Sequence, residues 1–137
     1  EATEPFTGLG FTKQLTETND KQSLAVTAVQ LAETLGAKGI IVITRRGLMA
    51  DYVTNCHPQK TRIFAFTNDS QTRRRLILNR NLTPYRTAFS SDPEKTLQTS
   101  FDVLKERAGL QSNDKVVVIS DVLAGTVIEA IQIRHLP

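Results

Sequence analysis

The feature that most constrains the fold is an alternation of short apolar segments with segments of helical periodicity. Three apolar segments have the length and the β-branched or aromatic content of buried strands: 39–43 (GIIVI), 62–66 (RIFAF) and 115–120 (KVVVIS). Between them, apolar residues recur at the spacing of amphipathic helices. Strands that alternate with helices form a largely parallel sheet, because parallel neighbours need long crossover connections.

Capping residues and glycines indicate where the helices begin and end. The first helix is expected to begin at a cap formed by Asn19 or Asp20, and to end at Gly36. Its apolar face is expected to carry Leu24, Ala28, Leu31 and Leu35. The other helices are expected over 46–56, over 70–80 after a cap at Asn68 or Asp69, and over 93–108, with Pro93 in its first turn after Ser90, Ser91 and Asp92.

Two weaker strand segments complete the predicted sheet. Segment 82–89 contains Pro84, which cannot donate to a neighbouring strand and so favours an edge position. Segment 127–136 follows 115–120 after about six residues, which is too short for a helical crossover and predicts an antiparallel last strand. We therefore expect an α/β three-layer sandwich with about five mostly parallel strands and helices on both faces. Residues 1–18 are interpreted as a lead-in segment and 19–137 as the domain.

Composition excludes several classes of function. The 137 residues suit one domain, and no apolar run is long enough to span a membrane. A net charge of +3 without basic stretches that contain aromatic residues does not predict nucleic-acid binding. Cys56 is the only cysteine, and the N-terminal residues lack the pattern of a secretory signal. These features favour a cytoplasmic protein.

The sequence offers no convincing catalytic or metal-binding constellation. His57 and His135 are the only histidines, and neither has the spacing of metal ligands. A hydrolase that uses Ser120 or Cys56 is the weakest hypothesis, because no histidine is placed to activate Ser120 and Cys56 is expected to pack on the apolar face of its helix. We predict no catalytic residue and no metal site within these residues.

One strand-to-helix turn has the features of an anion site. Thr44, Arg45, Arg46 and Gly47 follow segment 39–43 directly and lie at the N-terminus of the helix predicted over 46–56. Backbone N–H groups and the helix dipole favour an anion at such a position, and arginine adds bidentate contacts. A plain strand-to-helix connection is the alternative. The other basic cluster, Arg73 to Arg75 with Arg80, is interpreted as a solvated helix face or a source of subunit salt bridges.

The order of motifs along most of the chain resembles the C-terminal domain of pyruvate kinase. The matching features are Ala37-Lys38 before the strand, the turn and helix start at 44–50, His57-Pro58, the strand at 63–67, an arginine at Arg73 or Arg74, Asn81 to Pro84, and AGLQSNDKVVVIS at 108–120. The first residues, EATEPF, are similar to the segment that leaves the catalytic barrel in that family.

The resemblance implies an allosteric and oligomerisation domain. The parent enzyme would transfer a phosphoryl group from phosphoenolpyruvate to ADP in glycolysis, giving pyruvate and ATP, in a barrel that uses Mg²⁺ and K⁺. These residues contain none of that barrel, so we expect no such activity and no cofactor in this domain. Its partners would be its own barrel and the other subunits of a homo-tetramer. The alternative is a free-standing module of this type that senses a phosphorylated metabolite or a partner protein.

The resemblance also implies a sugar-phosphate effector site between the turn and a loop after the last long strand. The residues implicated are Thr44, Arg45, Arg46 and Gly47 in the turn, with Gly125 and Thr126 in the loop. Arg46 and Met49 stand where the family has hydroxyl residues, and the loop is shortened to SDVLAGTVIEA, with Asp121 in place of a usual glycine. These departures weigh against the usual effector, whereas the two arginines retain positive charge.

Overall fold

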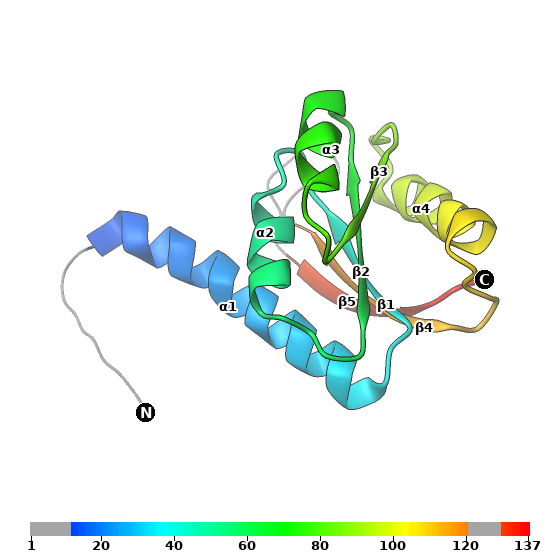
Figure 1. Ribbon diagram of the computed structural model, residues 1–137, viewed down its shortest axis with the longest axis horizontal. Helices are drawn as coiled ribbons and strands as arrows, with labels where there is room; N and C mark the ends of the chain where they lie inside the picture. The colour runs from blue at the N-terminus through cyan, green and yellow to red at the C-terminus, as the bar shows by residue number, and fades with distance from the viewer. Residues whose placement is uncertain (1–11, 121–129) are drawn as a thin grey trace.

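The computed structural model describes residues 12–120 and 130–137, which form a five-stranded sheet and four helices (Figure 1). In chain order the described elements are α1 (Thr12–Leu35), β1 (Gly39–Ile43), α2 (Leu48–Asn55), β2 (Arg62–Thr67), α3 (Ser70–Ile77), β3 (Thr83–Arg86), α4 (Pro93–Arg107), β4 (Lys115–Ser120) and β5 (Ala130–His135).

The strand order of the sheet is β3-β2-β1-β4-β5. The first four strands are parallel, and β5 pairs antiparallel with β4, with Lys115 opposite His135 and Ser120 opposite Ala130. The predicted α/β fold and the antiparallel last strand are therefore confirmed. Pro84 lies in β3, an edge strand, where the lack of a backbone N–H does not remove a hydrogen bond between central strands.

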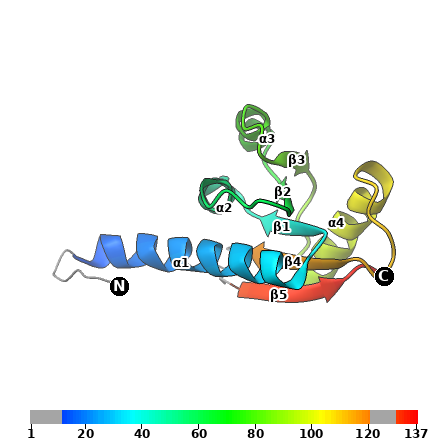
Figure 2. The ribbon, with the colours of Figure 1, turned by 60° about the horizontal axis from the view of Figure 1, so that its bottom comes forward.

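Alternate residues of the central strands point to opposite faces of the sheet and build two cores. Ile40 and Val42 pack with residues of α1, α2 and α3 on one face. Ile41 and Ile43 pack with residues of α4 on the other. This period of two gives the three layers, with α1, α2 and α3 on one side of the sheet and α4 on the other (Figure 2).

The start and the buried face of α1 differ from the prediction. The helix begins at Thr12, so Asn19 and Asp20 lie inside it and do not cap it. No glycine or proline interrupts residues 12–35, and a helix anchored by packing propagates through polar residues of moderate propensity. Figure 1 shows the N-terminal part of α1 extending beyond the sheet. The lead-in assignment of 1–18 stays a prediction.

Small residues line the contact of α1 with the rest of the domain. The fully buried positions are Ala25, Ala28 and Ala32, while Leu24 and Leu31 are only partly buried. Of the predicted apolar face, Ala28 alone is fully buried. Alanines allow the helix to approach the sheet closely, and the leucines pack at the margin of the contact.

The predicted cap of α3 and the predicted start of α4 at Pro93 are confirmed. Asp69 caps α3 by accepting the N–H of Thr72 on its carboxylate, and Asp92 caps α4 by accepting the N–H of Glu94. Gly36 has a φ of 65° after α1, a conformation that glycine adopts without strain. The helix α2 begins at Leu48, two residues later than predicted, and α2 and α3 end one and three residues earlier than predicted, at Asn55 and Ile77.

Candidate anion site at the carboxyl edge of the sheet

The strand order places the predicted turn at the topological switch point, where successive strands are added on opposite sides of β1. β1 lies between β2, the next strand in the chain, and β4, which comes later. Ligands of open α/β sheets bind at the carboxyl ends of strands at such a switch point. Residues 44–47, here termed the 44–47 turn, follow β1 at this place. Gly125 and Thr126 lie outside the described residues, so their predicted role stays a prediction.

Thr44 holds the turn together from inside. Its side chain is 1% exposed, and its hydroxyl oxygen accepts the N–H of Gly47 at 3.1 Å. Its own N–H donates to the carbonyl of Phe66 in the neighbouring strand at 3.0 Å. The hydroxyl of Thr44 is therefore buried and stabilises the turn, and it does not face the surface where a ligand would bind.

Gly47 has a positive φ and lies close to α3, and both features disfavour a residue with a Cβ. Its φ is 89°, in the left-handed region, and it is the N-terminal flanking residue of α2 without a side-chain cap. A Cβ at this position would also lie 3.3 Å from side-chain carbons of Thr72 and Leu76 in α3, and against the guanidinium of Arg75. The glycine therefore lets the turn pack closely on α3.

Residues at the end of β2 and in α3 hold the main chain of Arg45 and Arg46 in place. The hydroxyl of Thr67 donates to the carbonyl of Arg45 at 2.8 Å and accepts the N–H of Asp69 at 3.2 Å. Arg75 donates to the carbonyl of Arg46 at 2.8 Å and pairs with Asp51 of α2 at 3.2 Å. The backbone of Arg45 and Arg46 is held while their side chains stay exposed.

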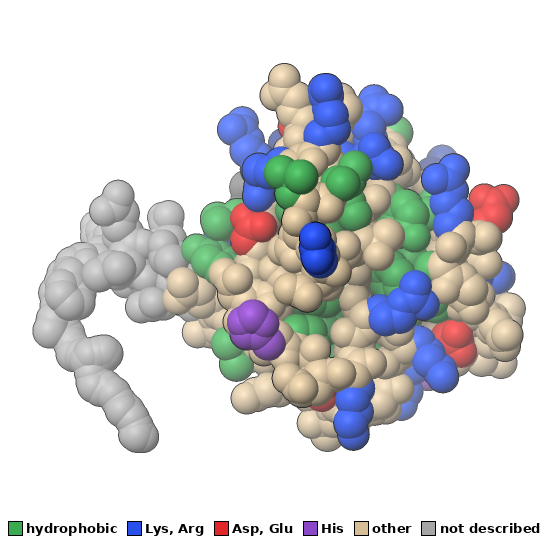
Figure 3. Space-filling view, in the orientation of Figure 1, with side chains coloured by type: hydrophobic (Ala, Val, Ile, Leu, Met, Phe, Trp, Pro, Cys, Tyr) green, Lys and Arg blue, Asp and Glu red, His purple; other side chains and the backbone are tan. Residues whose placement is uncertain are grey.

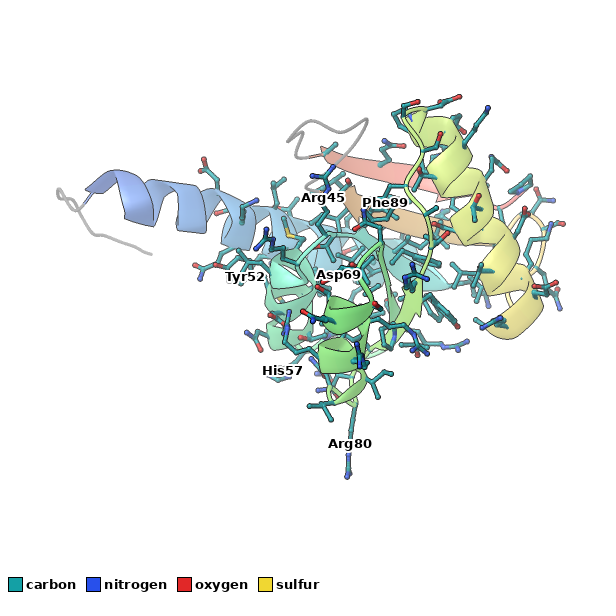
Figure 4. The ribbon with its side chains drawn as sticks, turned by 90° about the horizontal axis from the view of Figure 1, so that it is seen from above. Arg45, Tyr52, His57, Asp69, Arg80 and Phe89 are labelled. Atoms are coloured by element: carbon teal, nitrogen blue, oxygen red, sulfur yellow. The ribbon has the colours of Figure 1, made fainter. Side chains whose placement is uncertain are left out.

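Both arginines line one cavity of about 600 Å³, here termed the switch-point cavity. Figure 4 shows Arg45 and Asp69 in the same region of the molecule, while Arg80 points away from the body. Within the described residues, the side chains of Arg45 and Arg46 make no hydrogen bond or ion pair. The complete lining is Arg45, Arg46, Asn68, Asp69, Gln71, Thr72 and Arg75.

The charges in this cavity are mixed. The hydroxyl and N–H of Thr72 both donate to Asp69 and lower the pKa of its carboxyl, and the charge of Arg46 lowers that pKa further. Asp69 is therefore ionised near neutral pH and opposes an anion. Arg75 is already paired with Asp51, so Arg45 and Arg46 carry the attraction.

The residues considered for hydrolysis are not assembled. Ser120 ends β4 at the carboxyl edge of the sheet, whereas His135 ends the antiparallel β5 opposite Lys115, at the amino edge. His57 follows the end of α2, which returns from the carboxyl edge. Cys56 donates to the carbonyl of Tyr52, and burial raises the pKa of its thiol, which lowers its thiolate content.

The residues that hold the 44–47 turn in place could not be identified from local sequence patterns. Thr67 ends a predicted strand and Asp69 is a predicted helix cap, and neither pattern indicates a contact with the turn. Arg75 looked like one of three equivalent arginines, yet it alone reaches the turn. The usable signal was the rotation of about 100° per helical residue, which sends successive side chains to different sides.

Comparison with known proteins settles the family. The model described as "Pyruvate kinase, alpha/beta domain" matches residues 22–130. The chain belongs to this family. Pyruvate kinase isozyme A, chloroplastic, of Ricinus communis is 35% identical over 116 residues, which cover 85% of this chain and 19% of the relative. The same isozyme of Nicotiana tabacum is 34% identical over 116 residues, which cover 85% of this chain and 18% of the relative.

Solved structures show the same fold. Cryptosporidium parvum pyruvate kinase in complex with ADP superimposes with a TM-score of 0.75 at 23% identity, covering 85% of this chain and 24% of that chain. The pyruvate kinase alpha/beta domain described here thus spans about a fifth of the length of its curated relatives. No helix in the described part of the chain is long and apolar enough to cross a membrane.

Proposed function

We propose that this chain is the allosteric and oligomerisation domain of a pyruvate kinase, whose separate catalytic barrel transfers a phosphoryl group from phosphoenolpyruvate to ADP in glycolysis. The observation that carries the proposal is the family match over residues 22–130. The aligned residues cover only 19% of the length of a relative, which is consistent with a larger parent enzyme. In residues 12–120 and 130–137, no cluster of three or more His, Cys, Asp or Glu side chains could hold a metal. The proposal assigns Mg²⁺ and K⁺ to the barrel by family resemblance.

The native polypeptide provides the test. If the proposal is right, its reading frame encodes a barrel upstream of Glu1, and the purified protein converts phosphoenolpyruvate and ADP to pyruvate in a coupled assay. A reading frame that begins close to Glu1 would refute this assignment and support a free-standing binding module. The same sequencing result also fixes which protein the ligand and assembly experiments must use.

Subunit assembly is proposed to use the side of the domain formed by α1 and β5. β5 is an edge strand of the sheet, and Ile133 on it is 49% exposed. Val26 on α1, which contacts β5, is 44% exposed. An edge strand with apolar neighbours is suited to pairing with another chain. We expect the native protein to sediment as a homo-tetramer.

The switch-point cavity is proposed to bind a phosphorylated effector through guanidinium contacts. Arg45 and Arg46 are exposed and held by their main chains, whereas the hydroxyl of Thr44 is engaged inside the turn. Asp69 in the same cavity lowers the affinity for an anion. Each exposed charge contributes about 1 kcal/mol or less, so weak binding is expected.

Calorimetry tests this effector site. In the native protein, fructose 1,6-bisphosphate is expected to give heat of binding, with an affinity that is weaker in Arg45→Ala and in Arg46→Ala and unchanged in Arg80→Ala, because Arg80 does not line the cavity. Equal affinities in all four proteins would refute the assignment. An increase in affinity in Asp69→Asn would support the opposing role of that carboxylate.

The cellular location needs its own test. The relatives are named as chloroplastic proteins, whereas composition favours the cytoplasm. We propose a cytoplasmic location, which imaging of a C-terminal fluorescent fusion of the native polypeptide would check. Signal confined to plastids would overturn it.

A further inference from the structure

A second concave surface brings together arginines from three separate elements. Arg73 and Arg74 of α3, Arg86 at the end of β3 and Arg107 at the end of α4 all line one concavity of about 480 Å³. Its remaining lining residues are Ser70, Tyr85 and Val103. We term it the arginine concavity. Figure 3 shows basic side chains gathered over α3 at the top of the molecule.

Within the described part of the chain, this surface lacks counter-charges. No Asp or Glu lines the arginine concavity. None of its four arginines has a side-chain hydrogen bond or ion pair there, unlike Arg75, which pairs with Asp51, and Arg134, which pairs with Glu94. Like charges held together without counter-ions repel each other, and a bound anion relieves that repulsion.

The shape and the aromatic wall favour a small ligand. A volume of about 480 Å³ lies within the usual range of small-molecule sites. Tyr85 stacks on the buried ring of Phe66, with centroids 5.2 Å apart, so one side of the concavity is rigid. Arginines from three elements suit an anion whose charge is spread over several oxygens, because a guanidinium group can bind phosphate bidentately.

We propose that the arginine concavity binds a small molecule that carries two or more phosphate groups. Its seven lining residues are all different from those of the switch-point cavity, so this site does not depend on the proposed effector site. Within α3, Arg73 and Arg74 serve the concavity, while Arg75 braces the 44–47 turn.

Tyrosine fluorescence offers a probe of this surface alone. The chain has no tryptophan and two tyrosines, so Tyr52→Phe leaves Tyr85 as the only emitter among its residues. In that background, inorganic tripolyphosphate at about 50 mM NaCl should change Tyr85 emission saturably. Should the native polypeptide contain further tyrosines or tryptophans, the amide shifts of Tyr85 and Arg86 by NMR are the readout. Absence of a saturable change, or shifts confined to the 44–47 turn, would overturn the proposal.

Matched variants assign the binding to its residues. Arg73→Ala with Arg107→Ala should weaken tripolyphosphate binding about tenfold or more, and the two lysine substitutions should weaken it less, because lysine keeps charge but loses the bidentate contact. Arg80→Ala should leave affinity within about twofold, because Arg80 lines neither cavity. Unchanged affinity in both the alanine and the lysine pair would overturn the proposal.

Competing ligands define the class. Displacement of tripolyphosphate by fructose 1,6-bisphosphate would indicate a sugar-phosphate source, and displacement by ATP a nucleotide source; either supports the proposal. Tighter binding of an oligoglutamate peptide or of a short RNA than of every small phosphate would overturn it, because a macromolecular surface would then be the better description.

Discussion

Thr67→Val tests whether one buried hydroxyl holds the 44–47 turn in place. The side chain of Thr67 is 0% exposed, and its hydroxyl joins the carbonyl of Arg45 to the N–H of Asp69. Valine has nearly the same shape, so the change removes two hydrogen bonds and little packing. At about 1 kcal/mol net for each bond, we expect a loss of about 2 kcal/mol in the free energy of unfolding.

Urea denaturation followed by circular dichroism measures this loss, and a domain of this size should also show a lower Tm by about 8 °C. Thr99→Val is the matched control, because Thr99 is exposed and its hydroxyl donates only to the carbonyl of Lys95 in its own helix. A loss below about 0.5 kcal/mol, similar to the control, would refute the reasoning. Thr44→Val removes the second brace, and the two changes should be non-additive because they act on one turn.

Three further predictions concern backbone, pH and core. Gly47→Ala should cost about 1–3 kcal/mol of unfolding free energy, and more than Gly36→Ala, because both have positive φ but only a Cβ at Gly47 meets neighbouring atoms; chemical denaturation compares the two. The pKa of Asp69 is lowered in the folded state, so the stability that its ionised carboxylate contributes is present above the unfolded pKa and is lost as the pH falls through the folded pKa. Asp69→Asn can still cap the helix, so it should make the free energy of unfolding depend less on pH on the acid side. An unchanged pH dependence would contradict this. Phe101→Ala, at a side chain 1% exposed, should cost about 3–5 kcal/mol by thermal or urea unfolding, whereas a loss similar to that of an exposed position would contradict the packing of α4.

Most of the architecture could be predicted because helix starts, turns and strand lengths depend on residues that are close together in the sequence. A cap at Asp69, a helix start at Pro93 and an edge position for Pro84 follow from local hydrogen-bonding capacity. The short connection before β5 limits it to an antiparallel neighbour. The start of α1 could not be predicted in this way, because Asn19 and Asp20 have the composition of a cap but lie in a helix that packing extends to Thr12.

The sequence by itself determined the alternation of strands and helices, the position of the 44–47 turn after a buried strand, and the excess of positive charge. These depend on residue spacing and side-chain chemistry within a few positions. Only the tertiary structure decided how that charge is distributed. It sends Arg75 to the turn and Arg73 and Arg74 to a different concavity, where they meet arginines from β3 and α4. The reason is that helical rotation and crossover packing bring distant residues together, and neither contact is encoded in the local sequence.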